Sequence, residues 1–535
     1  MAKHPSSRYF ILKSIIISNL FGVDIMEEAV EICKLRLFLK LVAQVNRLEQ
    51  IEPLPDVDFN IRAGNTLVGY VSLDEIREAV ERERGGQKKL AFSDGQEEVA
   101  AIEEKALIAD RAYQRFREMQ TEQGMDASQF TEAKRELRRR LDTLGEELDR
   151  YLAAEYGVVP RKREAFAAWL KSHQPFHWFA EFYGIMHRGG FDVIIGNPPY
   201  VECKGSNVPY SVRSYATLET KNLYAYVCER SLALMTYGAR VGLIVPLAAI
   251  SVSTTRTLRT QLLMSTGLIW HSSFGFRPAK LFEGVNLRLT ILLATKHSTH
   301  TRTLSTRYIL WSQEERPSLF SKLQYVEATF TDEDHFPKIS DPIELSIIAK
   351  ILGTKVELGT HFVRTGGSVI NFHRSPLYWI RAMDFEPRFE SATKTRSTYH
   401  IRDIRVSTDP LAKLAGCVLN SSTFFFWFSK MCNCRNLTNE DVRDFPVGSP
   451  HTHMVERCAV LFKRLMEDYR RNSTTTVRYN CQYETFYPSL SKPIINDIDS
   501  ILAEHYRFDE EEFDHIVNYD IKYRMGQEDE AEGDE

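Results

Sequence analysis

The stretch that most constrains this chain is Phe-Asp-Val-Ile-Ile-Gly-Asn-Pro-Pro-Tyr, residues 191–200. Residues 191–195 are apolar apart from Asp192, a run typical of a buried strand. The two prolines that follow Asn197 remove two successive backbone donors and exclude helix and central strand. The chain is therefore expected to leave its strand at Gly196 and to present an amide, two prolines and an aromatic ring beyond it.

The composition of this tetrapeptide suits one kind of ligand. The amide oxygen of Asn197 accepts hydrogen bonds, and Pro198 offers a carbonyl without an N–H of its own. Two such acceptors can hold both hydrogens of an exocyclic amine, while Tyr200 offers a flat surface to the ring that carries the amine. A tight turn without function is the plain alternative. Ligands of open parallel sheets bind beyond the carboxyl ends of the strands, and this position favours the functional interpretation.

Strand–helix–strand patterns surround this motif. Residues 15–23, IIISNLFGV, predict a buried strand that ends at Asp24, and a second short strand is expected over 59–62, before the turn-like AGNTLVG. Between them the pattern is helical from Met26, with one apolar face made of Ala29, Ile32, Leu35, Leu39 and Val42. RVGLIVP and TILLAT predict later strands of the same sheet. The alternation is typical of a parallel α/β sheet.

A charged segment interrupts the α/β pattern between residues 76 and 157. It predicts two helices separated at GMDASQ, the second with an apolar seam of Leu137, Leu141, Leu144, Leu148 and Leu152. We interpret the segment as an inserted antiparallel hairpin. Its charged faces are typical of a solvated spacer, and contact with DNA or a partner is the alternative.

FDVIIGNPPY resembles the catalytic motif of N6-adenine DNA methyltransferases, which have a Rossmann-like fold. The resemblance makes Asn197, Pro198, Pro199 and Tyr200 the catalytic residues. NLFGVDIMEEAVEICKLRL is similar to a second motif of these enzymes and NIRAGNTLVG to a third. By this resemblance the strand-end Asp24 holds the ribose of S-adenosylmethionine, Ile25 packs on its adenine and Asn65 contacts the adenine edge, where family members often carry Asp.

Three further segments extend the resemblance over most of the chain. PFHWFAEFYG, FRPAKLFEGVNLRLTILLAT and NSSTFFFWFSKMCNCRNLTNEDVRDFPV look like parts of the large methylases of type IIG restriction–modification systems. The implied reaction flips an adenine out of double-stranded DNA and transfers methyl directly to its N6, with no metal and no nucleophilic residue.

One expected family motif is missing. The glycine loop, roughly Asp-Pro-x-x-Gly-x-Gly-x-Phe, should lie upstream of Asp24, but only 23 residues precede it and Gly22 is their only glycine. Glycines at this loop let the backbone approach the cofactor closely. The chain is therefore expected to be an amino-terminally truncated member, whose partner is a missing amino-terminal fragment or a nuclease subunit.

DNA recognition is expected in the second half, where arginines alternate with aromatic residues. HFVRTGGSVINFHRSPLYWIR contains Arg364 and Arg374, and the loop CNCRNLTNEDVRDFP contains Arg435 and Asn436. Arg364 and Arg374 are predicted DNA contacts because arginines supply phosphate contacts, and Arg435 and Asn436 are predicted DNA contacts by the family resemblance. A hydrophobic core strand with snorkelling arginines is the alternative for the first segment. Phe424 to Phe428 are expected to be core, and Thr438 is expected to cap a short helix.

The bulk composition adds a few limits. The chain has 535 residues, too many for one core, and a net charge of −4 that partly reflects the acidic tail QEDEAEGDE. Its eight cysteines lack metal-ligand spacing, and no apolar run reaches the length of a membrane span, so we expect a cytoplasmic protein without metal or membrane contact.

The predicted fold is an α/β Rossmann-like methyltransferase sheet, incomplete at its amino end, with an inserted helical hairpin and a carboxy-terminal α+β target-recognition domain. Five segments follow: methyltransferase domain, first part, 1–75; helical insertion, 76–165; catalytic part, 166–300; target-recognition domain, 301–490; carboxy-terminal helices and acidic tail, 491–535.

Two other functions are compatible with the motif. A catalytically inactive or split fragment would bind DNA or a partner subunit without transferring methyl groups. Protein-glutamine and ribosomal-RNA methyltransferases carry a similar motif, although they are typically compact, whereas more than 200 residues follow the sheet here.

Overall fold

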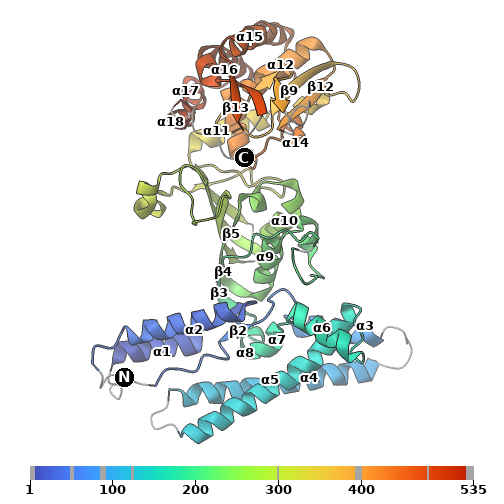
Figure 1. The fold of residues 1–535 in the computed structure, drawn as a ribbon, viewed down its shortest axis with the longest axis vertical. Helices are drawn as coiled ribbons and strands as arrows, with labels where there is room; N and C mark the ends of the chain where they lie inside the picture. The colour runs from blue at the N-terminus through green and yellow to red at the C-terminus, as the bar shows by residue number, and fades with distance from the viewer. Residues whose placement is uncertain are drawn as a thin grey trace. The chain divides into compact units, whose positions relative to one another are not determined.

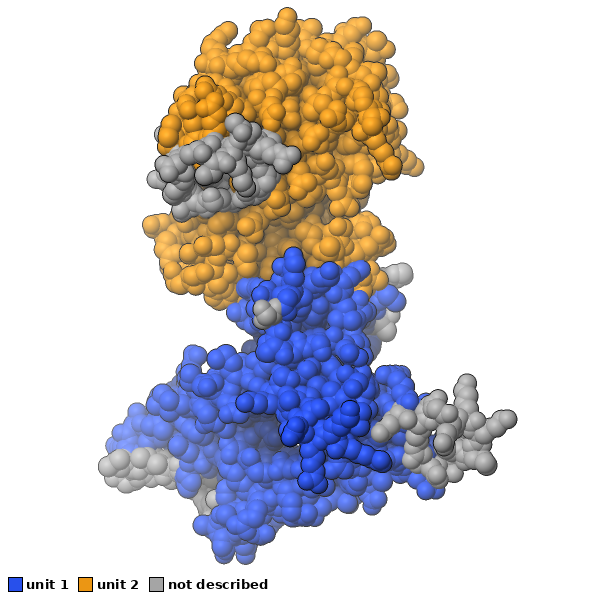
Figure 2. Space-filling view, turned by 45° about the vertical axis from the view of Figure 1, so that its right-hand side comes forward, with its two compact units in different colours: residues 1–243, 264–267, 293–299 blue, residues 244–263, 268–292, 300–535 orange. Residues whose placement is uncertain are grey.

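The computed structural model describes residues 6–47, 53–84, 92–121, 126–205, 207–297, 301–376, 378–391, 400–478 and 481–525. The acidic tail lies outside these residues. The chain divides into two compact units: unit 1 comprises residues 1–243, 264–267 and 293–299, and unit 2 comprises 244–263, 268–292 and 300–535. Figure 1 labels the helices and strands, and Figure 2 colours unit 1 blue and unit 2 orange.

Unit 1 is mostly helical and carries the first strands of the chain. Its elements are α1 Ser7–Asn19, β1 Gly22–Asp24, α2 Glu27–Val42, β2 Ile61–Ala63, α3 Leu73–Arg84, α4 Phe92–Met119, α5 Ala127–Glu155, α6 Arg163–His173, α7 Trp178–Glu181, α8 Tyr183–Met186, β3 Phe191–Gly196, the 3-10 helix η2 Ala216–Thr220, α9 Leu223–Leu234 and most of β4 Met235–Pro246.

The strand predicted over residues 15–23 is wrong in its first part. Residues 15–19 belong to helix α1, whose start is capped by Ser6, with the amide of Tyr9 donating to the Ser6 hydroxyl at 3.3 Å. A short apolar run does not distinguish a strand from a half-buried helix, and here the N-cap at Ser6 favours the helix. Only Gly22–Asp24 form a strand, β1, which pairs in parallel with β2 so that Asp24 lies opposite Ala63.

Helix α2 forms as predicted, but its predicted apolar face is not buried. Ile32, Leu35, Leu39 and Val42 are 57%, 56%, 59% and 49% exposed. The helix packs instead through Val30 and Leu41, which are buried in a cluster with Tyr9 and Ile61. The spacing of apolar residues therefore predicted the helix correctly, but it did not predict which face of α2 packs against the rest of unit 1.

The two predicted helices of the inserted segment form as α4 and α5, which lie side by side in Figure 1. All five leucines of the predicted seam of α5 are buried. Asp126 caps α5, with its carboxylate accepting from the amides of Ser128 and Gln129 at 2.7 and 3.3 Å. Burial of this seam supplies most of the stability of such long, charged helices, since propensity alone contributes little.

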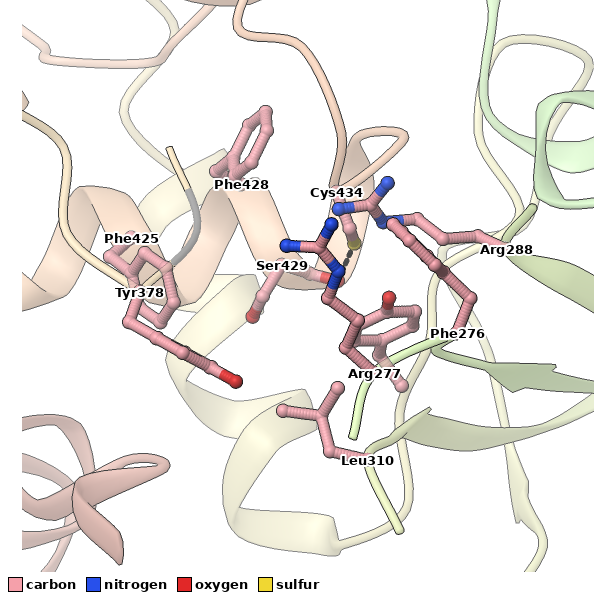
Figure 3. A pocket seen from close by; sticks show the side chains of 10 residues that line it. Phe276, Arg277, Arg288, Leu310, Tyr378, Phe425, Phe428, Ser429 and Cys434 are labelled. Carbon is pink, nitrogen blue, oxygen red and sulfur yellow. Dashed lines mark hydrogen bonds between the residues drawn. The ribbon is translucent and has the colours of Figure 1, made fainter. Parts of the chain in front are cut away.

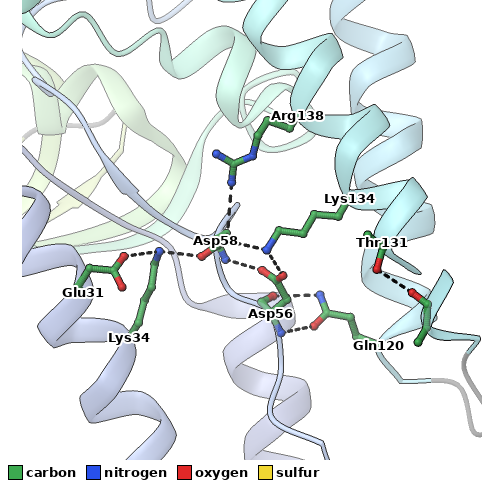
Figure 4. A network of polar contacts seen from close by, with 9 residues as sticks. Glu31, Lys34, Asp56, Asp58, Gln120, Thr131, Lys134 and Arg138 are labelled. Carbon is green, nitrogen blue, oxygen red and sulfur yellow. Dashed lines mark hydrogen bonds and ion pairs between the residues drawn. The ribbon is translucent and has the colours of Figure 1, made fainter. Parts of the chain in front are cut away.

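A polar network joins the hairpin to the segment before β2 (Figure 4). Asp58 accepts from Lys34 of α2 at 2.8 Å and from Lys134 of α5 at 2.7 Å, and Lys134 also pairs with Asp56. Burial alone would raise the pKa of the Asp58 carboxyl, but hydrogen bonds from the two lysines hold it at about 2. The network fixes the root of β2 relative to both α2 and the hairpin.

The central sheet is mixed, with strand order β3-β4-β6-β5-β7-β8. β3 pairs with β4 in parallel, with a register shift between Phe191 and Val193, while β7 pairs with β5 in parallel and with β8 antiparallel. The expectation that residues 191–195 are buried is wrong, because Val193 and Ile195 are 62% and 82% exposed. β3 is an edge strand of this sheet, and its side chains on one face lack a cover among the described residues.

Unit 2 contains the remaining strands and the carboxy-terminal helices. Its elements, some of which share residues with unit 1, are α10 Arg256–Ser265, β5 Thr266–Phe274, β6 Leu289–Lys296, β7 Arg302–Ile309, β8 Val326–Glu327, α11 Pro342–Leu352, β9 Ser368–His373, β10 Ala382–Met383, β11 Phe389–Ser391, β12 Ile401–Val406, α12 Asp409–Asn420, α13 Ser422–Met431, α14 Asn439–Arg443, α15 Thr452–Arg471, β13 Thr474–Arg478, β14 Cys481–Thr485, α16 Lys492–Tyr506, α17 Glu510–Asn518 and α18 Ile521–Arg524.

The core of unit 2 is built around α12 and α13. Every residue of α13, Ser422–Met431, is buried, which confirms the predicted core role of Phe424 to Phe428. Thr438 caps α14 in a capping box with Asp441, as predicted. Among the described residues no single helix is long and apolar enough to cross a membrane; α12 and α13 reach that length and hydropathy only together, across a bend of 64°.

Candidate functional site

Two of the predicted cofactor residues lie at the carboxyl ends of paired strands. Asp24 ends β1, and Asn65 follows β2 by two residues. The amide of Gly64 donates to the Asp24 carbonyl at 2.9 Å, which holds the two strand ends together. The Asp24 side chain is exposed, and its Oδ1 accepts from the amide of Met26 at 2.8 Å. Ile25 between them is half-buried.

Asn65 carries the clearest sign of a binding site. It is 2% exposed, and its Oδ1 accepts from the amide of Leu67 at 3.1 Å. Its Nδ2 is buried without a hydrogen-bond partner of ordinary geometry among the described residues. Burial raises the pKa of the nearby Tyr210 to about 12, an effect that the side chain of Asn65 partly opposes. The Asn65 amide group therefore has its oxygen bonded within the loop and its nitrogen beside Tyr210, and a ligand acceptor could take the nitrogen's hydrogen bond.

Hydrogen bonds from Arg230 of α9 and from Tyr215 hold the segment that follows Asn65. Arg230 is 8% exposed, and its Nε donates to the Tyr215 hydroxyl at 2.7 Å. The Tyr215 hydroxyl in turn donates to the carbonyl of Leu67 at 2.9 Å, and Arg230 also reaches the carbonyl of Gly69 at 3.3 Å. This network ties the Asn65 loop to α9, the helix that follows the Asn197–Tyr200 segment. Arg230 and Tyr215 were missed by the sequence analysis, because an arginine inside an apolar helix gives no indication of what it contacts.

The approach of this segment to a neighbour explains one glycine. Gly69 has φ of +145°, and a β-carbon there would lie 2.1 Å from the carbonyl oxygen of Phe176. The amide of Phe176 donates to the carbonyl of Val68 at 2.7 Å. Only glycine allows the two backbones to come this close.

The predicted catalytic motif begins directly at the end of β3. Asn197 and Pro199 are exposed, Tyr200 is half-buried and Pro198 is buried. The Tyr200 hydroxyl donates to Oδ1 of Asn197 at 2.6 Å. Burial raises the pKa of Tyr200 to about 12, so its hydroxyl is protonated and can donate at neutral pH. An amide oxygen has two lone pairs, and the one not used by Tyr200 can accept from a ligand.

Backbone pairing anchors the other side of the motif. The amide of Cys203 donates to the carbonyl of Lys221 at 2.7 Å, and the amide of Leu223 donates to the carbonyl of Val201 at 3.0 Å. Lys221 has φ of +50°, which turns the chain from this pairing into α9. The motif is thus fixed between β3 and α9, which preorganises its acceptors.

Strands β1 and β3 share one aromatic cluster. Phe21, directly before β1, contacts Phe191 of β3 edge-to-face with ring centroids 6.0 Å apart. Both rings also contact Phe182, and Val23 and Ile194 pack against the same buried cluster. The roots of β1 and β3 therefore lie side by side in unit 1, and Asp24 and Asn197 follow at the ends of the two strands.

Three of the four predicted DNA contacts lie together in unit 2. The carbonyl of Arg374 accepts from the amide of Leu437 at 2.6 Å, and the Ser375 hydroxyl donates to Oδ1 of Asn436 at 3.2 Å. Arg435, next to Asn436, is exposed.

Arg364 is separated from this group by β9. A six-residue strand is roughly 20 Å long, and Arg364 and Arg374 lie beyond its opposite ends. Arg364 lies instead near the exposed Arg405, because the amide of Val363 donates to the carbonyl of Arg405 at 2.9 Å. Alternation in IRDIRV could have indicated Arg405 as an outward-facing cation.

A small pocket within unit 2 carries two further arginines that the sequence analysis did not single out (Figure 3). Arg277 and Arg288 both lie against the ring of Phe276, at 5.3 and 5.0 Å from its centroid. The Nε of Arg288 is buried without a hydrogen-bond partner among the described residues. Burial raises the pKa of the lining Tyr308, and Arg288 opposes this rise. The ten lining residues include no carboxylate, so the pocket suits an anionic group.

Comparison with known proteins finds one family model that matches part of the chain. Residues 18–282 match the Eco57I restriction-modification methylase family, over just under half of the chain. A protein of Methanocaldococcus jannaschii, named as a type II restriction enzyme and methyltransferase, is 31% identical over 218 residues. That alignment covers 35% of this chain and 18% of the relative, so this chain spans less than a fifth of the curated relative that it matches.

Solved structures show only a distant likeness. The DrdV–DNA complex is 10% identical, covers 56% of this chain and 47% of that chain, and has a TM-score of 0.33. The Type IIL enzyme MmeI in complex with DNA is 10% identical, covers 62% and 57%, and has the same TM-score. The type IIG endonuclease BpuSI is 11% identical, covers 97% and 77%, and has a TM-score of 0.24. At these TM-scores the likeness carries no functional conclusion.

Proposed function

We propose that this chain is a site-specific DNA methyltransferase polypeptide of a restriction–modification or similar phage-defence system, acting on N6 of adenine with S-adenosylmethionine. The observation that carries the proposal is the sequence Asn197-Pro198-Pro199-Tyr200 at the end of parallel strand β3, inside the segment that matches the methylase family. Ligands of parallel sheets bind at this position. A cytoplasmic location and double-stranded DNA as partner belong to the same proposal.

The residues at the ends of β1 and β2 fit the cofactor. Asp24 would accept from ribose hydroxyls, the half-buried Ile25 would pack on the adenine, and the buried Nδ2 of Asn65 would donate to a ring nitrogen. When bound, S-adenosylmethionine supplies an electrophilic methyl group.

The residues of the motif handle the target base. Oδ1 of Asn197 and the carbonyl of Pro198 would accept the two hydrogens of the exocyclic amine, and Tyr200 would stack on the flipped base. Holding the amine by its hydrogens directs the nitrogen lone pair out of ring conjugation, and positioning of this kind can supply much of the rate enhancement. Neither a metal nor a nucleophilic side chain is needed for this work.

Five arginines and one asparagine of unit 2 are the proposed DNA contacts. Arg374, Arg435 and Asn436 form one group, Arg364 lies beyond the other end of β9, and Arg277 and Arg288 form the anion-suited pocket. Arginine contacts to phosphate supply affinity without sequence information.

A second candidate function has support of its own. Exposed apolar side chains on two elements favour a chain that acts as part of a larger assembly, either as a split enzyme or as a DNA-binding subunit without activity. These side chains are Ile32, Leu35, Leu39 and Val42 of α2 and Val193 and Ile195 of β3. A protein-glutamine or ribosomal-RNA methyltransferase is the remaining alternative, and the motif alone does not distinguish its substrate.

Calorimetric titration of the purified chain with S-adenosylmethionine tests the proposal first. The matched variants are Asp24→Ala and, as control, Asp142→Ala, an exposed carboxylate in the middle of α5. We expect micromolar binding that is lost in Asp24→Ala and kept in Asp142→Ala. Methylation of adenine-containing duplex DNA follows, with N6-methyladenine measured by mass spectrometry. Methyl incorporation into a protein or RNA substrate, with none in DNA, would refute the DNA assignment.

A further inference from the structure

The carboxyl end of α6 lies between two segments of the candidate site. The amide of Asn65 donates to the carbonyl of Gln174 at 2.7 Å. The amide of Ser211 donates to Nε2 of His173, the last residue of α6, at 3.2 Å. We name residues 207–215, which contain Ser211, the wall segment. Two successive residues at the end of one helix therefore hold the Asn65 loop and the wall segment.

The hydrogen bonds of His173 fix the position of its proton. A backbone amide can only donate, so Nε2 accepts and the hydrogen of the neutral ring lies on Nδ1. Nδ1 lies 2.8 Å from the hydroxyl of Ser172, which donates in turn to the carbonyl of Trp169 at 3.0 Å. A second proton on the ring would go to Nε2 and would face the Ser211 amide, donor against donor. The contact with the wall segment therefore requires a neutral His173.

Aromatic side chains enclose the ring of His173. Trp169 stacks on it with ring centroids 5.2 Å apart, and Tyr156 meets it edge-on at 5.0 Å. The ring of Tyr210, which precedes Ser211 in the wall segment, lies 6.4 Å away. Tyr156 directly follows α5, the second long helix of the inserted hairpin. The insertion and α6 together therefore hold the imidazole in the orientation that the wall segment needs.

The charges around His173 favour the neutral ring. Burial lowers the pKa of His173 below its ordinary 6.5, and the guanidinium of Arg213 in the wall segment lowers it further, against an opposing hydrogen bond to the backbone of Trp169. Arg213 itself donates to the carbonyl of Glu155 at 2.9 Å, a second link between the wall segment and the insertion. The Glu155 carboxylate is engaged elsewhere, since it accepts from the Tyr70 hydroxyl at 3.1 Å. The cation that approaches His173 from the wall segment therefore opposes its protonation.

The wall segment meets the Asn65 loop at two points. The half-buried Tyr210 lies beside the side chain of Asn65, and the hydroxyl of Tyr215 donates to the carbonyl of Leu67 at 2.9 Å. The hydrogen bond to His173 lies between these two points in the sequence and directly after the first. Without that hydrogen bond, Tyr210 would lose the support nearest to it.

We propose that His173 is a positioning residue, which accepts from the amide of Ser211 and so holds Tyr210 beside Asn65 as a wall of the candidate cofactor site. This role rests on the proposed function, in which Asn65 contacts the cofactor. It gives the inserted helices a task beyond that of a solvated spacer. The wall segment should loosen as the pH falls below 6.5, because the imidazole binds a proton more readily when it is released from the Ser211 amide.

Hydrogen exchange measured by mass spectrometry tests the contact on the purified full chain at pH 7.5, without any ligand. His173→Phe keeps an aromatic ring between Trp169 and Tyr156 but has no acceptor. His173→Gln offers its Oε1 to the same amide and does not titrate. The control is His187→Phe, which replaces an exposed histidine that stacks on Tyr183 at 5.2 Å. Circular dichroism checks that all three variants are folded.

We expect the amides of the wall segment to exchange about tenfold faster in His173→Phe, as the loss of one hydrogen bond implies. Exchange in His173→Gln and His187→Phe should match that of wild type. Unchanged exchange in His173→Phe would overturn the inference.

Calorimetric titration with S-adenosylmethionine measures the effect on the site. The affinity should be about tenfold weaker in His173→Phe than in wild type at pH 7.5. It should fall from pH 7.5 to pH 5.5 in wild type and stay constant in His173→Gln. Equal affinities of wild type and His173→Phe, or the same pH dependence in His173→Gln as in wild type, would overturn the positioning role while leaving the proposed function intact. If wild type does not bind S-adenosylmethionine, the cofactor assignment alone is refuted, and the exchange rates still decide whether His173 holds the wall segment.

Discussion

The buried ion pair between Lys430 and Glu344 allows a quantitative prediction for unit 2. Lys430, in α13, is 0% exposed and Glu344, in α11, is 3% exposed. The Lys430 ammonium also lies 5.2 Å from the ring centroid of Phe426 and 4.7 Å from that of Tyr519. Replacing Lys430 by Met keeps the length of the side chain but leaves the carboxylate buried without its cation. The expected loss is about 3–5 kcal/mol in the free energy of unfolding.

The pH dependence gives the prediction a sign. Burial alone would raise the pKa of Glu344, but Lys430 holds it at about 2, below its usual 4.5. In wild type this carboxylate therefore stabilises the fold above pH 4.5, and the contribution is lost as the pH falls toward 2. In Lys430→Met the lowering charge is gone and burial raises the pKa. The penalty should accordingly shrink as the pH falls from 8 to 5, because protonation of the buried Glu344 carboxyl removes the uncompensated charge.

Urea unfolding followed by tryptophan fluorescence at pH 8 and pH 5 measures both effects. The double variant Lys430→Met, Glu344→Gln is the control, because removing both charges should recover most of the lost stability. A Lys430→Met chain within about 1 kcal/mol of wild type would contradict the burial argument, since surface pairs rarely contribute more. A penalty that stays constant or grows at pH 5 would contradict the assigned protonation state.

Three further predictions concern the site and its supports. Asn197→Ala should lower the methylation rate by roughly 10²-fold, as removal of one preorganised hydrogen-bonding group does in other enzymes, whereas Tyr200→Phe keeps the ring and should change it only a few-fold; single-turnover assays separate the two. Asp58→Asn should lower the free energy of unfolding by about 1 kcal/mol at pH 7, a small value because the Asp58 side chain is partly solvated. The contribution of the Asp58 carboxylate is present above pH 3.8 and is lost as the pH falls toward 2, so urea unfolding should show a smaller difference at pH 3 than at pH 7. Arg435→Ala should weaken DNA binding equally for all sequences and reduce the salt slope of the binding constant by about 1, and an unchanged slope would remove Arg435 from the phosphate contacts.

Local sequence patterns predicted the helices of this fold better than they predicted which helix faces are buried. The spacing of leucines in α5 was enough to predict a buried seam, because the same face that is apolar is also the one that meets α4. The apolar spacing in α2 was equally regular, yet the surface that would cover it is not provided by the described residues. Periodicity reports the chemistry of a face, and burial also depends on what else is present.

The positions of the candidate residues on their strands were predictable where one residue type has few roles, whereas their functions stay predictions. The two prolines of Asn-Pro-Pro-Tyr predicted where β3 ends, and short turn sequences predicted the ends of β1 and β2. Arg230 and Tyr215 could not be found, because they support the loop after Asn65 from positions 163 and 148 residues away from Leu67 in the sequence. Arg364 was grouped with Arg374 through proximity in the chain, although the length of β9 separates them.

The position of the α4–α5 hairpin has a consequence for the order of synthesis. β2 ends at Ala63 and β3 begins at Phe191, so roughly 130 residues leave the ribosome between the two halves of the candidate site. At usual elongation rates this takes on the order of ten seconds. During that interval β1 and β2 have an unpaired edge and α2 an apolar stripe, while β3 does not yet exist. A chaperone or subunit present at that moment would meet these surfaces before the rest of the sheet competes for them, so the timing of co-expression, and not only its level, should affect the yield of folded protein.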